Sequence, residues 1–185
     1  MNQALVIIDA QQELIEGKDG EPGVFNKASL LGNINAVIDQ ASEMGHFVVF
    51  MRDLDVAEGK GEGFEIHQSI KVPADAIVFD KKATNSFYAT PLLEALKAKQ
   101  VEHLIIMGCK TEHCIDTAVR AATVQGFDVT LVEDGHSTTN NAILSAEQII
   151  KHHNRILHGH YNVDHFSVVR KAEEDLFQPP HDIYR

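Results

Sequence analysis

Short apolar runs rich in β-branched residues alternate along the chain with stretches in which apolar residues recur every three or four positions. The runs predict five strands, at residues 4–8, 47–51, 76–79, 104–107 and 129–132. The stretches between them predict helices at residues 29–43, 91–99, 113–125 and 144–157. Because strands and helices alternate and the strands are apolar nearly throughout, we predict an α/β protein whose parallel sheet is covered on both faces.

The pattern contains no internal repeat and no interdomain linker, so residues 1–185 are predicted to form a single domain. A long segment at 53–75 carries glycines at 59, 61 and 63. Its spacing and position fit neither a Walker loop nor a dinucleotide-binding fingerprint. We interpret it as a flexible loop, and long loops in compact domains are often lids or binding loops.

Charge narrows the range of partners. The chain has 16 Lys and Arg against 27 Asp and Glu, a formal net charge of −11. Nucleic acids and anionic membrane surfaces require a basic face, so neither is an expected partner, and a small-molecule substrate is. No apolar run approaches the roughly 18 residues of a membrane span, and the first strand begins too early for a signal peptide. We therefore expect a cytoplasmic protein.

Chemistry-bearing residues follow three of the predicted strands. In parallel sheets the active crevice lies beyond the carboxyl ends of the strands. Asp9 follows the first strand, Lys81 and Lys82 the third, and Cys109 and Cys114 the fourth. Each alone has a structural explanation: an Asp caps a helix or a turn, a Lys is a solvated charge, and a Cys is small buried packing.

Together these residues suit acyl transfer by a thiol. Cys114 stands at the first turn of a predicted helix, where the helix dipole and a nearby ammonium favour the thiolate over the neutral thiol. A carboxylate such as Asp9 accepts the thiol proton and later returns it to a leaving amine. Backbone N–H groups at the helix start can hold the developing oxyanion.

The two cysteines allow a second interpretation. They number only two, which excludes a disulfide framework, and four residues separate them instead of the two of a Cys-x-x-Cys redox motif. We therefore favour packing for Cys109 and chemistry for Cys114, with a redox role as the alternative.

Three segments carry a family resemblance. They are Asp9-Ala10-Gln11, Lys81 with the segment 85–90, and the run from Gly108 in which Thr111 and Cys114 follow at three and six residues. In this order they resemble the isochorismatase-like cysteine hydrolase superfamily, over residues 4 to about 137. The resemblance implies a Rossmann-like three-layer α/β/α sandwich with a mainly parallel sheet of about six strands. It also implies a homodimer or homotetramer.

The same resemblance assigns roles to residues. It implies a catalytic triad of Asp9, Lys81 and Cys114, with Lys81 preferred to Lys82 because it stands four residues before Asn85. It implies a cis peptide bond at Cys109–Lys110, with the backbone N–H groups of Lys110 and Cys114 forming an oxyanion hole. Candidate substrate-binding residues are Gln11, Phe87, His113 and His136. Core packing is the alternative for Phe87, and solvent exposure is the alternative for His113.

Two departures from the family pattern matter. Nicotinamidases of this superfamily carry an Asp-x-His metal motif after the second strand, and here the segment reads Arg52-Asp53-Leu54-Asp55. The histidine is missing, so we expect neither a metal nor another cofactor. The aromatic residue that often follows the first motif is replaced by Leu14.

The resulting hypothesis is a cysteine-dependent hydrolase that cleaves an amide-type C–N bond of a small molecule through a thioester. One alternative is an isochorismatase-type vinyl-ether hydrolase, in which Asp9 is the acid and the thiol of Cys114 is a bystander. Another is a non-catalytic binding or redox-sensing protein on the same scaffold.

Overall fold

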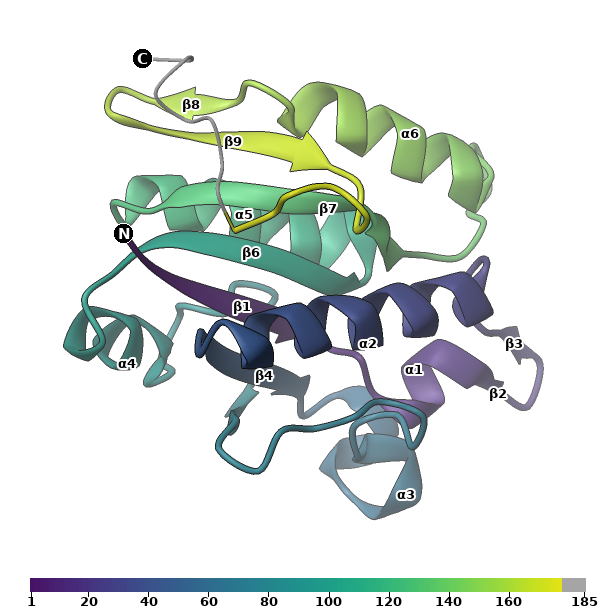
Figure 1. Ribbon diagram of the computed structural model, residues 1–185. Coiled ribbons are helices and arrows are strands. Elements are labelled where there is room, and N and C mark those ends of the chain that lie inside the picture. The colour runs from purple at the N-terminus through teal and green to yellow at the C-terminus, as the bar shows by residue number, and fades with distance from the viewer. Residues whose placement is uncertain (178–185) are drawn as a thin grey trace.

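The computed structural model describes residues 1–177 and has a central sheet of seven strands (Figure 1). Their order across the sheet is β5-β4-β1-β6-β7-β9-β8. Six strands run parallel, and the two-residue β8 pairs antiparallel with β9. The bounds are β1 Asn2–Ile8, β4 Phe47–Asp53, β5 Ile77–Lys81, β6 Val101–Cys109, β7 Asp128–Ser137, β8 Tyr161–Asn162 and β9 His165–Arg170. The predicted α/β class and mainly parallel sheet are confirmed.

Helices cover both faces of this sheet. Alternate residues of β1 point to opposite faces: Leu5 and Ile7 pack with α2 (Lys27–Glu43), whereas Val6 and Ile8 pack with α4 (Leu92–Ala98) and α5 (Asp116–Val124). Figure 1 shows α2 in front of the sheet and α5 behind it, and α6 (Ala146–Leu157) extends the layer of α5. Among residues 1–177, no helix is long and apolar enough to cross a membrane.

Several elements were not predicted. A short helix α1 (Gln12–Glu16) and a hairpin of β2 (Gly17–Lys18) and β3 (Glu21–Pro22) follow the first strand, and β9 completes the far side of the sheet. The predicted loop 53–75 contains two helical turns, η1 (Val56–Gly59) and α3 (Gly61–Phe64). Apart from the six-residue β9, these elements are only two to five residues long and show no clear hydrophobic period.

The helix that carries Cys114 also begins earlier than predicted. A π-helical turn, η2 (Thr111–Ile115), precedes α5 and leads into it without a break. The predicted start at His113 was therefore two residues late. The turn follows directly on the carboxyl end of β6, so Cys114 lies close to the edge of the sheet where the parallel strands end.

Gly108 sets the spacing of β1 and β6 at that edge. It pairs with Ile8, its φ is +122°, and a Cβ built on it would lie 1.9 Å from the carbonyl oxygen of Ile8. Only glycine allows this approach without strain, because it has no Cβ and tolerates positive φ. The close approach holds the ends of β1 and β6, and hence Asp9 and the turn of Cys114, side by side.

We expect Gly108→Ala to lower the free energy of unfolding by at least about 3 kcal/mol, because the new methyl group meets backbone and the φ is unfavourable. Urea denaturation of the purified variants measures this loss. Gly32→Ala, in α2 where no atom lies within 4 Å of the added carbon, is the control. It should stabilise the protein by about 0.5–1 kcal/mol. A Gly108→Ala variant as stable as the parent would contradict the account.

Candidate active site

The site is organised around the ammonium of Lys81, the last residue of β5. Its side chain is 0% exposed. Nζ lies 2.9 Å from Asp9 Oδ2 and 2.5 Å from Asp53 Oδ2. It also lies 3.4 Å from Cys114 Sγ and donates to the carbonyl oxygen of Ala83 at 3.2 Å. The predicted trio of Asp9, Lys81 and Cys114 is thus brought together in one buried cluster.

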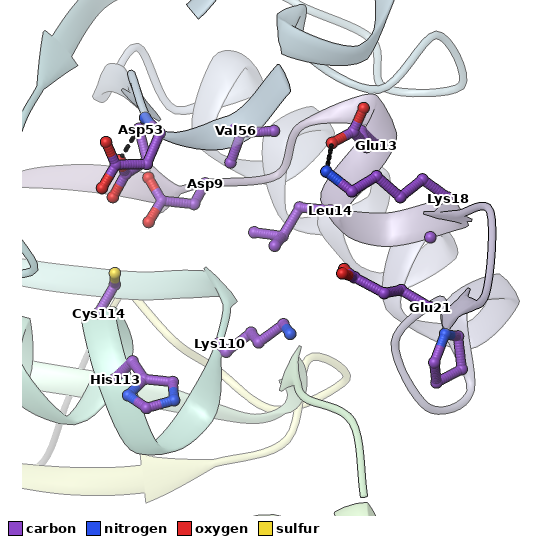
Figure 2. Close-up of a pocket in the computed structure, with 13 residues that line it drawn as sticks. Asp9, Glu13, Leu14, Lys18, Glu21, Asp53, Val56, Lys110, His113 and Cys114 are labelled. Carbon is purple, nitrogen blue, oxygen red and sulfur yellow. Dashed lines mark hydrogen bonds and ion pairs between the residues drawn. The ribbon is translucent and has the colours of Figure 1, made fainter. Parts of the chain in front are cut away.

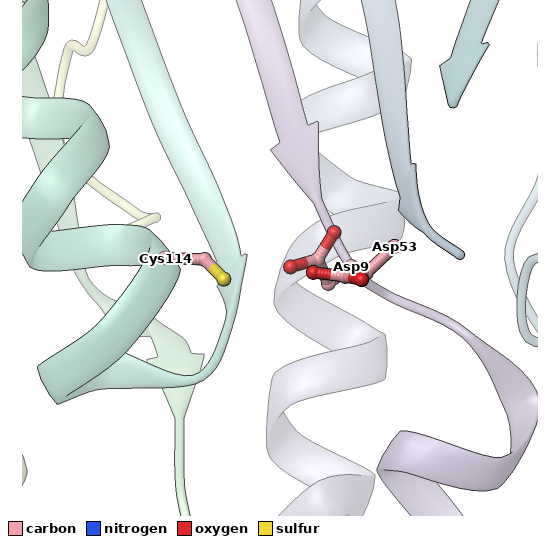
Figure 3. Close-up of side chains that lie close together, drawn as sticks. All are labelled: Asp9, Asp53 and Cys114. Carbon is pink, nitrogen blue, oxygen red and sulfur yellow. The ribbon is translucent and has the colours of Figure 1, made fainter. Parts of the chain in front are cut away.

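Four strand ends deliver these side chains. Asp9 follows β1, Asp53 ends β4, Lys81 ends β5 and Cys114 lies in the turn after β6. Figure 3 shows the two carboxylates facing the sulfur of Cys114 across a narrow space. The backbone of Asp9 has a φ of +50°, and its N–H donates to the Met51 carbonyl at 2.9 Å. This hydrogen bond ties the residue after β1 to the neighbouring strand β4.

Asp53 was not among the catalytic or substrate-binding residues predicted from the sequence. It pairs with Lys81 in the β4–β5 register, so the two side chains lie on the same face of the sheet. The available signal was its position at a strand end, the same signal that singled out Asp9. The sequence contains that signal at Asp53 as well, directly after the predicted strand 47–51.

Asp9 is an ionisable group that titrates near neutrality. Burial raises the pKa of its carboxyl to about 6, against the attraction of Lys81, which lowers it. Its Oδ1 accepts no hydrogen bond within the described residues. At pH 7 Asp9 is therefore mostly a carboxylate with one oxygen available. A carboxylate oxygen of Asp9 lies within 4.8 Å of Cys114 Sγ.

The pKa of the Cys114 thiol is raised, whereas the sequence predicted that it is lowered. Burial and the negative charge of Asp9 raise the pKa of Cys114 to about 12, and Lys81 only partly offsets them. The sequence-based expectation of a lowered thiol pKa was wrong, because desolvation outweighs the ammonium and the helix start. The resting pair is therefore a neutral thiol beside a carboxylate.

Lys81 itself remains a cation. Burial lowers the pKa of its ammonium, but the charge of Asp9 and the hydrogen bonds to the carboxylates of Asp53 and Asp9 outweigh burial, so the net pKa is raised. Lys81 therefore supplies a fixed positive charge beside the sulfur at any physiological pH.

A pocket of about 320 Å³ opens beside this cluster (Figure 2). Asp9, Lys110, His113 and Cys114 are the predicted site residues that line it. The remaining walls come from α1, the β2–β3 hairpin and the segment after β4, namely Glu13, Leu14, Gly17, Lys18, Glu21, Pro22, Asp53, Asp55 and Val56. None of the hairpin residues was a candidate from sequence, because their two-residue strands gave no pattern.

Two other candidates lie away from the pocket. Gln11 is buried, and its Nε2 donates to the carbonyl oxygens of Asp53 and Phe64 while its Oε1 accepts from the Asp53 N–H at 2.8 Å. It therefore fastens the end of β4 and the loop after it. Phe87 packs against the core, and the centroid of its ring lies 6.3 Å from that of Phe127. This agrees with core packing, the alternative given for Phe87 from the sequence.

His136 is a buried link between helices. Asn154 donates to the Glu133 carbonyl through Nδ2, so its Oδ1 accepts from His136 Nε2 at 2.8 Å. His136 Nδ1 then accepts from the Thr111 hydroxyl, also at 2.8 Å. Burial lowers the pKa of His136 to about 4, so the ring stays neutral at pH 7. The chain of bonds fixes the first residue of the Cys114 turn against α6.

The residues before the turn match the resemblance. The peptide bond between Cys109 and Lys110 is cis, as expected. Both cysteines are free, and Cys109 is fully buried in the core on the α2 side of the sheet, where burial raises the pKa of its thiol. The packing interpretation of Cys109 is therefore confirmed.

The donor set does not fit a resident metal ion. Ligand atoms of Asp9, Asp53 and Cys114 lie within 4.8 Å of one another, but the Lys81 ammonium already contacts all three. Two residues after Asp53, where a nicotinamidase has histidine, stands the exposed Asp55. An ammonium thus occupies the position where these oxygens and sulfur would bind a cation.

An α/β sheet that presents a thiol, a carboxylate and an ammonium at its strand ends is the arrangement of a hydrolase that works through acid–base and nucleophilic groups. The family model described as the isochorismatase domain matches residues 3–150. The chain belongs to the isochorismatase family and is a hydrolase.

Individual relatives support this membership. YrdC, an isochorismatase family protein of Bacillus subtilis (strain 168), is 29% identical over 71% of this chain and 72% of its own length. The nicotinamidase/pyrazinamidase of Mycobacterium tuberculosis (H37Rv) is 25% identical over 71% of this chain and 84% of its own. An isochorismatase structure from Pseudomonas putida KT2440 is 26% identical, with a TM-score of 0.81, covering 92% of this chain and 88% of that one.

We expect the carboxyl of Asp9 to titrate at a pH of about 6, followed through its ¹³C chemical shift by NMR. Lys81→Met should move the titration to higher pH, because the ammonium makes the largest contribution that lowers the Asp9 pKa. Lys82→Met, which removes the neighbouring exposed ammonium, is the matched control and should leave it in place. A wild-type titration near pH 4 would contradict the burial argument.

Proposed function

We propose that the protein hydrolyses an amide-type C–N bond of a small molecule through a thioester on Cys114. The observation that carries the proposal is the pairing of a neutral thiol with an ionised, partly unpartnered carboxylate at one end of the pocket. In this proposal Asp9 is the base, Cys114 the nucleophile, and Lys81 holds both in place.

The first half-reaction forms the thioester. Asp9 accepts the thiol proton while the sulfur attacks the carbonyl carbon, so that a C–S bond forms and the carbonyl electrons move to oxygen. The backbone N–H groups of Lys110 and Cys114 are the proposed donors to this oxyanion. When the intermediate collapses, the C–N bond breaks and Asp9 returns its proton to the leaving nitrogen.

The second half-reaction releases the acid. Asp9, now a carboxylate again, accepts a proton from a water molecule that attacks the thioester carbon. The C–S bond breaks, the sulfur recovers the proton from Asp9, and a carboxylic acid leaves. One carboxylate thus serves as base and then acid in each half-reaction, which suits a group whose pKa of about 6 lies close to neutral pH.

The raised thiol pKa agrees with this sequence of steps. A stable thiolate beside Asp9 would place two negative charges in a buried site, so proton transfer to Asp9 accompanies attack instead of preceding it. Throughout these steps the ammonium of Lys81 stabilises the negative charge, whether it lies on Asp9 or on the sulfur. Its Nζ lies 2.9 Å from Asp9 Oδ2 and 3.4 Å from Cys114 Sγ.

Screening amides, ureas and cyclic imides should identify a substrate whose turnover falls by at least about 10³-fold in Cys114→Ala, since the nucleophile is lost. Acid quenching during turnover, followed by mass spectrometry, should detect an acyl group on Cys114. Trypsin cleaves after Lys110 and so places the two cysteines on separate peptides.

Cys109→Ala is the matched control, because this thiol is buried away from the pocket; its turnover should stay within a fewfold of wild type. Normal turnover in Cys114→Ala without any adduct would refute the thioester mechanism. Absence of both turnover and adduct with every compound would favour the non-catalytic alternative.

A second candidate is vinyl-ether hydrolysis of an isochorismate-like substrate. It is favoured by the similarity to the Pseudomonas putida structure, which bears the name isochorismatase. Asp9 would then donate a proton to the substrate, and the thiol would take no part. Turnover of isochorismate that survives in Cys114→Ala would select this candidate over the thioester.

A further inference from the structure

The pocket has two chemically different ends. At one end lie Cys114 and Asp9, and Oδ1 of the buried Asp9 has no hydrogen-bond partner within residues 1–177. At the other end, Figure 2 shows Glu13, Lys18 and Glu21 of α1 and the β2–β3 hairpin. Leu14 lies between the two ends and points into the pocket.

Carboxylates outnumber ammonium groups on the lining. Five lining residues are acidic and two are lysines: Asp9, Glu13, Glu21, Asp53 and Asp55 against Lys18 and Lys110. Lys81 compensates Asp9 and Asp53 from behind, and Lys18 pairs with Glu13 at 3.1 Å. Within residues 1–177, neither Glu21 nor Asp55 takes part in an ion pair. The pocket therefore holds negative charge that the protein itself leaves unmatched.

Both lysines of the lining have a hydrogen-bond partner. Lys110 donates to the Thr139 hydroxyl at 3.4 Å, and because this partner is neutral the Lys110 charge remains. Three ammonium groups, of Lys18, Lys81 and Lys110, thus stand against the five carboxylates. The pKa of Lys18 is raised by its hydrogen bond to Glu13 and by the charges of Glu13 and Glu21. A positive charge at the hairpin end is thus stabilised by its surroundings.

The middle of the pocket is apolar. Leu14 and Val56 line it between the two ends, and the volume of about 320 Å³ lies at the small end of the range for ligand sites. Such a space accommodates a short hydrocarbon segment and little more.

From this arrangement we propose that the substrate is a small amide bearing a cationic group, an ammonium or a guanidinium, separated from the carbonyl by a short apolar segment. The carbonyl lies at Cys114, the segment lies against Leu14 and Val56, and the cation lies beside Glu21. Glu21 is then a specificity residue. The inference rests on the proposed function for the position of the carbonyl.

The same charges disfavour anionic substrates. A carboxylate placed beside Glu21 would meet an unpaired negative charge, and like charges at close range repel. The net charge of −11 adds to this field at long range. A dicarboxylate such as isochorismate therefore fits the pocket less well than a neutral or cationic amide does.

Three amides of nearly equal shape test the inference: γ-aminobutyramide, valeramide and succinamate, which end in an ammonium, a methyl and a carboxylate. Calorimetry measures their binding to Cys114→Ala, in which no turnover disturbs the equilibrium. We expect γ-aminobutyramide to bind about fivefold more tightly than valeramide and roughly twentyfold more tightly than succinamate. Added salt should reduce both ratios.

Glu21→Gln, made in the same Cys114→Ala background, should bring the ratio of ammonium to methyl compound close to one while leaving valeramide binding unchanged. Glu94→Gln, which removes an exposed carboxylate of α4 away from the pocket, should leave both unchanged. Because Glu21 is exposed on a hairpin, the variant is expected to fold, and thermal unfolding checks this. Equal affinities for the three amides, tighter binding of succinamate, or no effect of Glu21→Gln would overturn the inference.

The binding measurement and the adduct experiment fail independently. A charge preference in binding, together with full turnover by Cys114→Ala, would support the substrate class and refute the thioester. An acyl adduct on Cys114 without any charge preference would support the thioester and refute the substrate class.

Discussion

The buried ammonium of Lys81 is the interaction on which the site depends. An unpaired charge in a protein interior is costly, so Lys81 is tolerated only because carboxylates from two other strands meet it. Removing one partner of such a buried cluster typically costs about 3–5 kcal/mol. The charge therefore couples the packing of β1, β4 and β5 to the placement of the reacting groups.

This coupling explains the protonation state of the site. Two carboxylates already share one ammonium, so a further negative charge on the sulfur is unfavourable, and the thiol stays neutral. Asp9, buried yet stabilised by Lys81, titrates near neutrality. This protonation state suits the proposed transfer of a proton from Cys114 to Asp9. Lys81 serves in this scheme as a fixed charge.

In the proposed function, substrate selection and chemistry belong to different parts of the fold. The reacting groups lie on strand ends, which the sheet holds rigidly, whereas the outer pocket is built from α1, a short hairpin and the segment after β4. Gln11 connects the two regions, since it fastens the backbone at Asp53 while following Asp9 in sequence. Changes in the hairpin can therefore alter which substrate enters without disturbing the charges around Lys81.

The sequence by itself determined the alternation of strands and helices, the strand ends at Asp9, Lys81 and Cys114, and, through the family resemblance, the cis bond before Lys110. These depend on local patterns: apolar periodicity, and the rule that parallel strands present their carboxyl ends at one edge. Two-residue strands such as those of the hairpin carry no period, so their place in the pocket could not be predicted.

Only the tertiary structure decided that Asp53 shares Lys81, that Gln11 and His136 hold the backbone and the helices, and that the pKa of Cys114 rises instead of falling. Each outcome depends on burial and on partners far away in the chain. A helix start and a nearby lysine can be read from sequence, but how much water the fold excludes around a sulfur cannot, and here desolvation is the larger effect.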